Sequence, residues 1–375
     1  MDKHLFNNLA TVTELSKKEQ LYALIRANPF ISQQEIAAAL ALSRSAVAGY
    51  IGSLVRERRL LGRAYVLPSD RPILCIGAAN LDRKLRALKP LAMGTSNPAG
   101  AVESFGGVAR NIAENLARLG ASVSLITALG NDSSGRALLA QLDTVGVDTR
   151  GALTLDDAAS GTYTAVLDAD GQMAVALADM ALYDRVTPDF LALRRQQRAA
   201  ASLIVADLNL TREAVDTLQR DAAQDGVDLV IVAVSEPKMH RLPASLQGVR
   251  LLILNEGELA ARLGHALQDD AALAAACRAL QAQGAQDVVV TLGPRGVLFT
   301  GVDGTVGHLD APPAQVVDVT GAGDAFAAGL VLSLHGGGAD LALACRRGLQ
   351  LAALTIGCRE TVCPQLAPDT LKTLT

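Results

Sequence analysis

The sequence predicts two domains of different class: a small, mainly helical N-terminal domain, then a large α/β domain built on a mostly parallel sheet. From residue 72 onward, short apolar runs alternate with amphipathic helical segments, as in a parallel sheet covered on both faces. Residues 1–68 have a different pattern and end in a polar linker at 69–72. These 68 residues carry nine Lys and Arg against five Asp and Glu, whereas the whole chain has a net charge of −4. The N-terminal domain therefore favours an anionic partner.

The composition excludes several classes of protein. Half of the 375 residues are hydrophobic and 19% are charged, which rules out global disorder. Aromatic residues make up 3% and Trp is absent, which argues against an aromatic platform for single-stranded nucleic acid. The five cysteines are scattered without a C-x-x-C pair, which favours free thiols in a reducing cytoplasm over disulfides or zinc. No secretory signal and no apolar run near about 18 residues is present, so we expect no membrane partner.

Three helices and a hairpin are predicted in the N-terminal domain. Apolar spacing gives a helix over 17–27, which Pro29 ends. Ser32 and Glu35 form the start of a second helix that runs to about residue 40. Ser43 caps a third helix through residue 54, and loose alternation over 60–67 predicts the hairpin. Together these elements describe a winged helix-turn-helix domain over 1–68. The inward positions of the third helix are Val47, Ile51, Leu54 and Val55.

The arginines of this domain suit DNA. Arg44 begins the third helix, where contacts to base edges lie in such domains. Other arginines at the far end of that helix and in the hairpin suit phosphates. We expect residues 1–68 to bind DNA; the alternative is a domain used for dimerisation or for contact with the rest of the chain. The phosphate candidates are Arg56, Arg58, Arg59 and Arg63.

The α/β domain follows in regular order. Apolar runs predict strands at 73–76, 123–128, 203–206, 229–234, 251–254 and 288–292, and helices are predicted at 109–119, 134–144, 211–225 and 271–283. Residues 161–180 alternate around a turn at 169–171 and predict an antiparallel hairpin set apart from the main sheet. The basic cluster Arg194, Arg195 and Arg198 is interpreted as a solvated helix face.

The segment Asp318-Val-Thr-Gly-Ala-Gly-Asp-Ala-Phe326 carries the strongest functional signal. We predict a strand that ends near Val317 and a helix that begins near Asp324. The glycines between them allow a sharp turn, and the N–H groups of a helix N-terminus suit a phosphate. A carboxylate at that point can act as the base for a hydroxyl that attacks a phosphoryl group. The alternative is an ordinary glycine turn with Asp at a helix start.

At this point the chain resembles the ribokinase-like (PfkB) carbohydrate kinases, over about residues 72–370. The resemblance lies in the segment just described and in four others: 77–82 (GAANLD), 104–111 (SFGGVARN), 255–258 (NEGE) and 291–296 (TLGPRG). It implies a three-layer α/β/α fold at 72–375 with a small β lid at about 83–103 and 161–180. It also implies a kinase that uses ATP and Mg²⁺, and a homodimer in which lids pair.

The resemblance assigns residues to the catalytic and substrate sites. Asp324 is the expected base, and the backbone of Gly321, Ala322 and Gly323 is expected to stabilise the transferring group. Asp82 has two acceptors for a vicinal diol, and Asn80 can donate and accept; the alternative is an Asx-turn at a strand end. The implied substrate-binding residues are Asn80, Asp82, Gly106, Gly107, Asn111, Thr162 and Asp207.

Nucleotide and metal residues follow from the same resemblance. Asn255 and Glu258 share one helix face and are expected to organise Mg²⁺ through water; the alternative is a plain helix cap. Gly293 and Gly296 flank a turn after a strand, where nucleotides bind in α/β sheets, although a β-turn alone explains them too. Asp318 is expected to contribute to a monovalent-cation site for K⁺. The implied nucleotide-binding residues are Asn255, Thr291, Gly293 and Gly296.

Within the family, the chain is most similar to the pseudouridine kinases. The similarity covers 106–115, 161–165, 207–209 and 234–238, and some bacterial members also carry an N-terminal helix-turn-helix. The chain departs at Val232-Ala233, where an acidic residue often stands, and at Val319, where many members have Thr. The implied reaction is phosphorylation of the 5′-hydroxyl of pseudouridine. The alternatives are a kinase for uridine, inosine or ribose, and a DNA-binding regulator that uses the kinase-like domain as a sensor.

Overall fold

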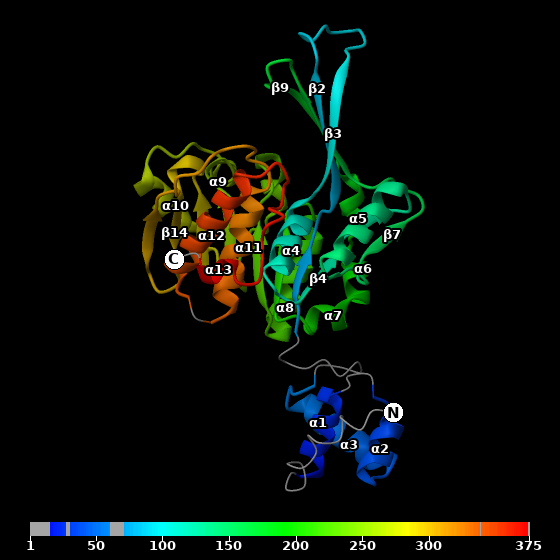
Figure 1. The fold of residues 1–375 in the computed structure, drawn as a ribbon. Helices are drawn as coiled ribbons and strands as arrows, with labels where there is room; N and C mark the ends of the chain where they lie inside the picture. Colours follow the sequence, from blue (N-terminus) through cyan, green and yellow to red (C-terminus); the bar gives the residue numbers. More distant parts are fainter. Residues whose placement is uncertain (1–15, 28–30, 61–70, 338, 374–375) are drawn as a thin grey trace. The chain divides into compact units, whose positions relative to one another are not determined.

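The computed structural model describes residues 16–27, 31–60, 71–337 and 339–373 (Figure 1). The chain divides into two compact units, Met1–Arg71 and Pro72–Thr375. No single helix within these described ranges is long and apolar enough to cross a membrane. The second and third helices together have the length and apolar composition of a membrane span, but a bend of 108° separates them.

The N-terminal unit contains the three predicted helices, α1 (Lys17–Ala27), α2 (Gln33–Leu40) and α3 (Arg44–Arg56). The capping box at the start of α2 is confirmed: Ser32 Oγ accepts from Glu35 N at 3.1 Å, and Glu35 accepts from Ser32 N at 2.8 Å. Ser43 caps α3 through Ala46 N. The three helices bury one shared apolar core, formed by Leu21, Ile25, Ile36, Leu40, Val47, Leu54 and Leu60.

Two predictions for this unit differ from the structure or lie outside it. Val55 was expected to face inward, but 41% of it is exposed, because it lies one position beyond the buried stripe through Val47 and Leu54. Apart from Leu60, the predicted hairpin at 60–67 and Arg63 lie outside the described residues, as do linker residues 69 and 70.

The second unit is built on a nine-stranded sheet, which confirms the predicted mostly parallel class. Seven strands run parallel, and an antiparallel pair, β14 and β15, extends one edge. In spatial order the strands are β15 (Val306–Leu309), β14 (Val297–Thr300), β13 (Asp287–Thr291), β12 (Val249–Asn255), β11 (Asp228–Val232), β10 (Leu203–Asp207), β1 (Ile73–Ile76), β4 (Val123–Ile126) and β6 (Val147–Asp148).

Helices cover both faces of this sheet, so the unit has three layers (Figure 1). Successive side chains of a strand point to opposite faces, and β1 shows this clearly. Ile73 and Cys75 belong to one apolar core, while Leu74 and Ile76 belong to the other. The first core is shared with α4 (Val108–Arg118), α5 (Ser133–Thr144), α11 (Ala322–His335), α12 (Leu341–Ile356) and α13 (Thr370–Thr373). The second is shared with α6 (Pro188–Leu193), α8 (Arg212–Asp225), α9 (Glu256–Leu263) and α10 (Asp270–Ala282).

A separate four-stranded sheet forms the predicted lid. Its order is β3 (Ala99–Gly106), β2 (Asn80–Ala87), β8 (Thr162–Leu167) and β9 (Met173–Asp179), and β8 and β9 are the predicted hairpin. Figure 1 shows these strands projecting from the layered body. A short pair, β5 (Ala128–Gly130) with β7 (Leu153–Leu155), lies apart from both sheets.

Two further expectations are wrong. Residues 311–316 form no strand before the glycine turn; they have no regular secondary structure, and Val317 is 50% exposed. Arg198 is not on a solvated face, because its side chain is 1% exposed. It donates to the Leu191 carbonyl and to Asp221 Oδ2, so a buried ion pair ties α7 (Arg195–Ala199) to α8.

Candidate active site

Asp207 organises the first part of the site, at the carboxyl end of β10. Its Oδ2 accepts from Ala78 N, in the turn after β1, and from Ala109 N, in the first turn of α4, both at 2.9 Å. Its Oδ1 accepts from Asn209 N at 2.8 Å. The side chain is 1% exposed, and burial raises its pKa. Predicted as a substrate contact, Asp207 uses both carboxylate oxygens here to hold the backbone around the site.

Asn80 and Asp82 lie together, as predicted, on one face of β2. Asn80 Nδ2 donates to Asp82 Oδ1 at 2.6 Å, and burial raises the pKa of Asp82. Gly106 pairs with Asn80 across the strands, and a Cβ on Gly106 would overlap the Asp82 carboxylate. Gly107 has φ of 99°, and a Cβ there would overlap the Ala78 carbonyl. The β3–α4 turn therefore requires Gly106 for its close approach to Asp82 and Gly107 for its close approach to the Ala78 carbonyl.

Thr162 begins β8 next to this group. It pairs in parallel register with Leu81, between Asn80 and Asp82 in sequence. The turn that leads into β2 is also held by Tyr183, whose hydroxyl donates to the Ala79 carbonyl at 2.6 Å. Tyr183 is fully buried, and a Cβ on Gly161 would overlap its hydroxyl. Sequence reasoning missed Tyr183, since nothing in its local pattern distinguishes it from a core aromatic.

The glycine turn leads into α11 as predicted, although the helix begins two residues earlier than expected. Gly321 has φ of 83°, and a Cβ there would overlap the Thr361 carbonyl, so the turn requires glycine. Because Gly321 is the N-cap, no side chain caps the first turn of α11. Open space surrounds the Cα of Gly323. The N-terminus of this 14-residue helix therefore offers N–H groups and a positive dipole end to an anion.

Asp324 lies in this first turn, partly exposed, opposite α4. Asn111 Nδ2 donates to Asp324 Oδ2 at 2.8 Å, so the structure brings these two predicted residues together. Burial raises the pKa of Asp324 to about 7, and the carboxylates of Asp207 and Asp82 add to the rise. The hydrogen bond from Asn111 and the charge of Arg110 act in the opposite direction. A carboxyl with such a pKa can accept a proton near neutral pH.

The carboxylate of Asp318 has a partner within the chain. Its carboxylate forms an ion pair with the ammonium of Lys84 from the lid strand β2, which also donates to Thr320 Oγ1 at 3.1 Å. The pKa of Asp318 is lowered, because the Lys84 and Thr320 hydrogen bonds outweigh its partial burial. The positive charge beside Asp318 in this structure comes from the chain itself, and its role at a K⁺ site stays a prediction. Lys84 carries no local motif, so its position could not be predicted.

Asn255 and Glu258 form a reciprocal capping box at the start of α9. Asn255 Oδ1 accepts from Glu258 N at 2.8 Å, and Glu258 Oε2 accepts from Asn255 N at 2.7 Å. Glu258 is 3% exposed, and burial raises its pKa. The negative charge of the neighbouring Glu236 carboxyl raises this pKa further. Oxygen donors are what Mg²⁺ prefers, and these bonds leave Glu258 Oε1 outside the capping box. The donor set therefore fits a hydrated Mg²⁺, with Glu236 as an acidic neighbour that sequence reasoning missed.

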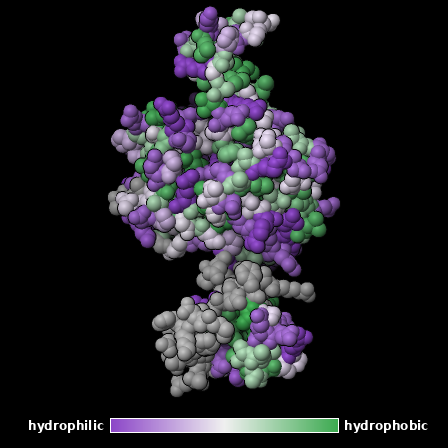
Figure 2. Space-filling model, turned by 45° about the vertical axis from the view of Figure 1, so that its right-hand side comes forward, coloured by the Kyte–Doolittle hydropathy of each residue, from purple (hydrophilic) through white to green (hydrophobic). Residues whose placement is uncertain are grey.

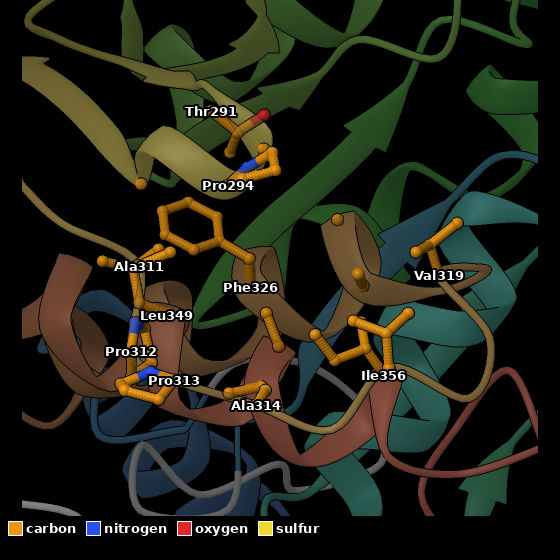
Figure 3. Close-up of a pocket in the computed structure, with 17 residues that line it drawn as sticks. Thr291, Pro294, Ala311, Pro312, Pro313, Ala314, Val319, Phe326, Leu349 and Ile356 are labelled. Atoms are coloured by element: carbon orange, nitrogen blue, oxygen red, sulfur yellow. The ribbon is translucent and has the colours of Figure 1, made fainter.

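A cavity of about 510 Å³ lies between the β13 end of the sheet and the α11–α12 pair (Figure 3). Thr291 and Pro294 line one side, and Val319 and Ile356 line another. Three of the four predicted nucleotide residues, Thr291, Gly293 and Gly296, line it, as does Gly323 of the helix turn. The fourth, Asn255, is not among its lining residues. Its walls are mainly apolar, which suits a planar base, and Gly323 connects it to the anion-binding turn.

In the N-terminal unit, two predicted DNA contacts have intramolecular partners. Arg59 donates to Glu19 through both terminal nitrogens, at 2.5 and 2.8 Å, and stacks over the Tyr22 ring at 4.1 Å. Arg44 begins α3 as predicted and donates to Gln34 of α2. Arg59 thus stabilises the fold of the unit, while the Arg44–Gln34 pair lies on its exposed surface.

Comparison with known proteins agrees with this geometry. Residues 70–366 match the model of the pfkB family of carbohydrate kinases, and residues 15–58 match a model of winged helix-turn-helix DNA-binding domains. The chain is 35% identical over 318 residues to the uncharacterized sugar kinase YeiI of Escherichia coli (strain K12), covering 85% of this chain and 87% of that protein. It is 31% identical over 295 residues to the pseudouridine kinase of the same organism, covering 79% and 93%.

A solved structure supports the fold. Arabidopsis thaliana ribokinase, complexed with ribose and ATP, aligns with a TM-score of 0.72 at 20% identity, over 81% of this chain and 98% of that one. The layered sheet with its projecting lid is therefore a ribokinase-like fold. The family match spans most of the chain, and both relatives exceed 30% identity over most of it. The chain belongs to the pfkB family of carbohydrate kinases and carries a winged helix-turn-helix domain at its N-terminus.

Proposed function

We propose that this kinase transfers the γ-phosphoryl group of ATP to the 5′-hydroxyl of a ribonucleoside, most specifically pseudouridine. The observation that carries the proposal is the Asp324 carboxyl with its raised pKa, at an uncapped helix N-terminus and near Asp82. A base and an anion-binding turn are thus adjacent to a group able to hold ribose hydroxyls. The five free thiols fit a reducing compartment, and we place the reaction in the cytoplasm.

In this proposal each part of the site has one task. Asp82 and Asn80 hold the ribose hydroxyls, and Gly106, Gly107, Asn111 and Thr162 shape the surrounding wall. Asp324 accepts the proton of the 5′-hydroxyl as that oxygen attacks the γ-phosphorus. The backbone of Gly321, Ala322 and Gly323 stabilises the charge on the transferring group.

The nucleotide and the metal are assigned to neighbouring elements. We assign the adenine to the apolar cavity lined by Thr291, Gly293 and Gly296. Mg²⁺ would be held through water by Asn255 and Glu258, and it supplies neutralisation of phosphate charge when bound. The ribokinase of A. thaliana, with ATP in its complex, supports ATP as the phosphoryl donor.

The preferred nucleoside is tested by a substrate panel. With ATP and Mg²⁺, we expect kcat/KM for pseudouridine to exceed that for uridine, inosine and ribose by at least about tenfold, because polar site groups discriminate strongly. Uridine is the matched control, since it differs only in the atom that joins base and ribose. If kcat/KM were higher for uridine or ribose, that compound and not pseudouridine would be the preferred substrate. No transfer to any of the four would contradict the nucleoside kinase proposal.

We further propose that the protein is a homodimer joined through its lids. Several large apolar side chains of the lid are exposed, and Figure 2 shows hydrophobic residues on its surface. Exposed apolar patches of this kind often mark a protein–protein interface. Lid pairing would cover these side chains together with the strand edges. The residues are Leu88 (68% exposed), Met93 (94%), Val102 (66%), Met173 (60%), Val175 (47%) and Leu177 (64%).

A dimer would present two helix-turn-helix domains to DNA, and we propose that it binds a two-fold site. Binding should weaken with salt, with a slope set by the number of phosphates that the basic residues contact, and a dimer doubles that number. We expect Arg44→Ala to reduce the preference for a selected genomic fragment over random DNA by about tenfold, with little loss of total affinity. Arg26→Ala, an exposed arginine at the end of α1, is the control that leaves the preference unchanged. Monomeric sedimentation, or equal binding of all DNA, would contradict this proposal.

A further inference from the structure

Arg110 is a buried cation next to the active site, and nothing described so far assigns it a role in the reaction. It lies on α4 between Ala109, which Asp207 holds, and Asn111, which contacts Asp324. Its side chain is 4% exposed. Burying a guanidinium is costly unless it is paired and hydrogen-bonded, so its partners indicate what it does.

The partners of Arg110 come from three elements. Nη2 forms an ion pair with Glu114, one turn along α4, and donates to Gln141 Oε1 of α5 at 3.0 Å. Nη1 donates to the Phe105 carbonyl, at the end of β3, at 3.0 Å. The same Nη1 donates to Asn111 Oδ1 at 2.7 Å. The guanidinium thus holds the Asn111 side chain from a rigid, buried position.

The Asn111 amide is the link between Arg110 and Asp324. A guanidinium can only donate, so the atom of Asn111 that faces Arg110 must be the oxygen. The NH₂ group must then face Asp324 Oδ2, at 2.8 Å, where it stabilises the ionised carboxylate. Without Arg110, the Asn111 amide would be free to rotate and present either atom to Asp324.

We propose that Arg110 is a positioning residue for the base: anchored by Glu114, it orients the Asn111 amide so that its NH₂ group holds Asp324 ready to accept the substrate proton. This inference rests on the proposed role of Asp324. Four groups influence the ionisation of that carboxyl: Asp82 from β2, Asp207 from β10, and Arg110 and Asn111 from α4. Both aspartates oppose ionisation of Asp324, and both α4 residues favour it.

The pH dependence of turnover tests the proposal. Because Asp324 must be ionised, kcat should fall as pH drops through about 7. Arg110→Met should move this acid limb up by about one pH unit, the size of one lost hydrogen bond to a charged group. At pH 6 its kcat should be about tenfold below wild type, with a small difference at pH 9 and little change in nucleoside KM.

Two variants separate orientation from charge. In Arg110→Lys the charge remains, but one nitrogen replaces the two that donate separately to Glu114 and to Asn111. The planar fork that orients the amide is lost, so the acid limb should still move up, by less than in Arg110→Met. Asn111→Leu should shift the limb through the lost hydrogen bond, and adding Arg110→Met to it should add only the smaller shift that comes from the lost charge of Arg110. Arg118→Met is the matched control, because Arg118 also pairs with Glu114 on α4 but has no contact with Asn111 among its hydrogen bonds here.

The outcomes are distinct. A wild-type acid limb in folded Arg110→Lys, or single shifts that add in full in the double variant, would overturn the orienting role while leaving the kinase proposal intact. A shift in Arg118→Met equal to that in Arg110→Met would also overturn it, because the effect would then come from Glu114 alone. Wild-type turnover in Asp324→Asn would instead overturn the proposed base. Thermal unfolding of each variant shows that the shifts are measured on folded protein.

Discussion

Asp324→Asn is expected to lower kcat by about 10²–10⁴-fold, the range for loss of a positioned general base. The amide keeps the size of the carboxyl but cannot accept the proton of the attacking hydroxyl. Substrate affinity should change little, because Asp82 and Asn80 remain. The folded state should not lose stability, since a carboxyl whose pKa is raised by burial gains nothing from its charge there. Steady-state kinetics and thermal unfolding measure both effects.

Asp340→Asn is the matched control for this variant. Asp340 is the N-cap of α12 and accepts from Leu343 N at 2.7 Å, outside the cluster around Asp324. Asparagine caps helices as well as aspartate, so turnover and stability should both stay at the wild-type level. Near wild-type kcat in Asp324→Asn would remove this residue from the mechanism. It would also favour the alternative in which the kinase domain is only a sensor, since a sensor has no need of a base.

Asp82→Ala is expected to raise KM for the nucleoside strongly and to lower kcat as well. The variant removes both acceptors for the ribose hydroxyls, and a misplaced 5′-hydroxyl attacks poorly. It should also move the acid limb of the pH profile down, because the Asp82 carboxylate helps to raise the pKa of Asp324. This direction is opposite to that expected for Arg110→Met, so one titration distinguishes the two effects.

Glu103→Ala is the control for the lid. Glu103 lies in β3, and its exposed ion pair with Arg83 has an Nε–Oε1 distance of 2.7 Å. Exposed pairs of this kind contribute at most about 1 kcal/mol, so kinetics should not change. If Asp82→Ala left KM unchanged for every nucleoside tested, Asp82 would not bind the sugar.

The sheet and its helices were predictable because their signals are local. Each buried parallel strand reads as a continuous apolar run, and each covering helix has an apolar stripe. The prediction of a strand near Val317 was wrong for a related reason. The valines at 316 and 317 are exposed, and the backbone N–H of Val317 donates to the carbonyl of Ile356, the last residue of α12, rather than to a strand. Apolar composition alone does not show whether a sheet edge is within reach.

The ion pairs could not be predicted, because their partners are far apart in sequence. Arg198 looked like part of a solvated basic face, yet it pairs with Asp221 in the interior. The ion pair of Asp318 is formed with Lys84 of the lid strand, 234 positions away in the chain. Local charge patterns indicate which residues carry charge, but only the topology determines what they face.

The candidate site was predicted in part. The motif glycines correctly indicated where the backbone needs φ above zero or close contact, as at Gly107 and Gly321. The pairing of Asn111 with Asp324 brings together two motifs that the sequence shows only as separate segments. The pKa of Asp324 is raised by burial and by the carboxylates of Asp82 and Asp207, which lie on two strands distant in sequence. No local pattern could therefore have indicated this pKa.

The most direct test of the account is to follow the phosphoryl group itself. Purified protein is incubated with ATP, Mg²⁺ and pseudouridine, and the products are identified by ³¹P NMR and mass spectrometry. The account predicts ADP and the 5′-monophosphate of the nucleoside in equal amounts, with product formation by Asp324→Asn reduced about 10²–10⁴-fold. ATP turned over with no nucleoside phosphate, or phosphate attached to a hydroxyl other than the 5′, would contradict it.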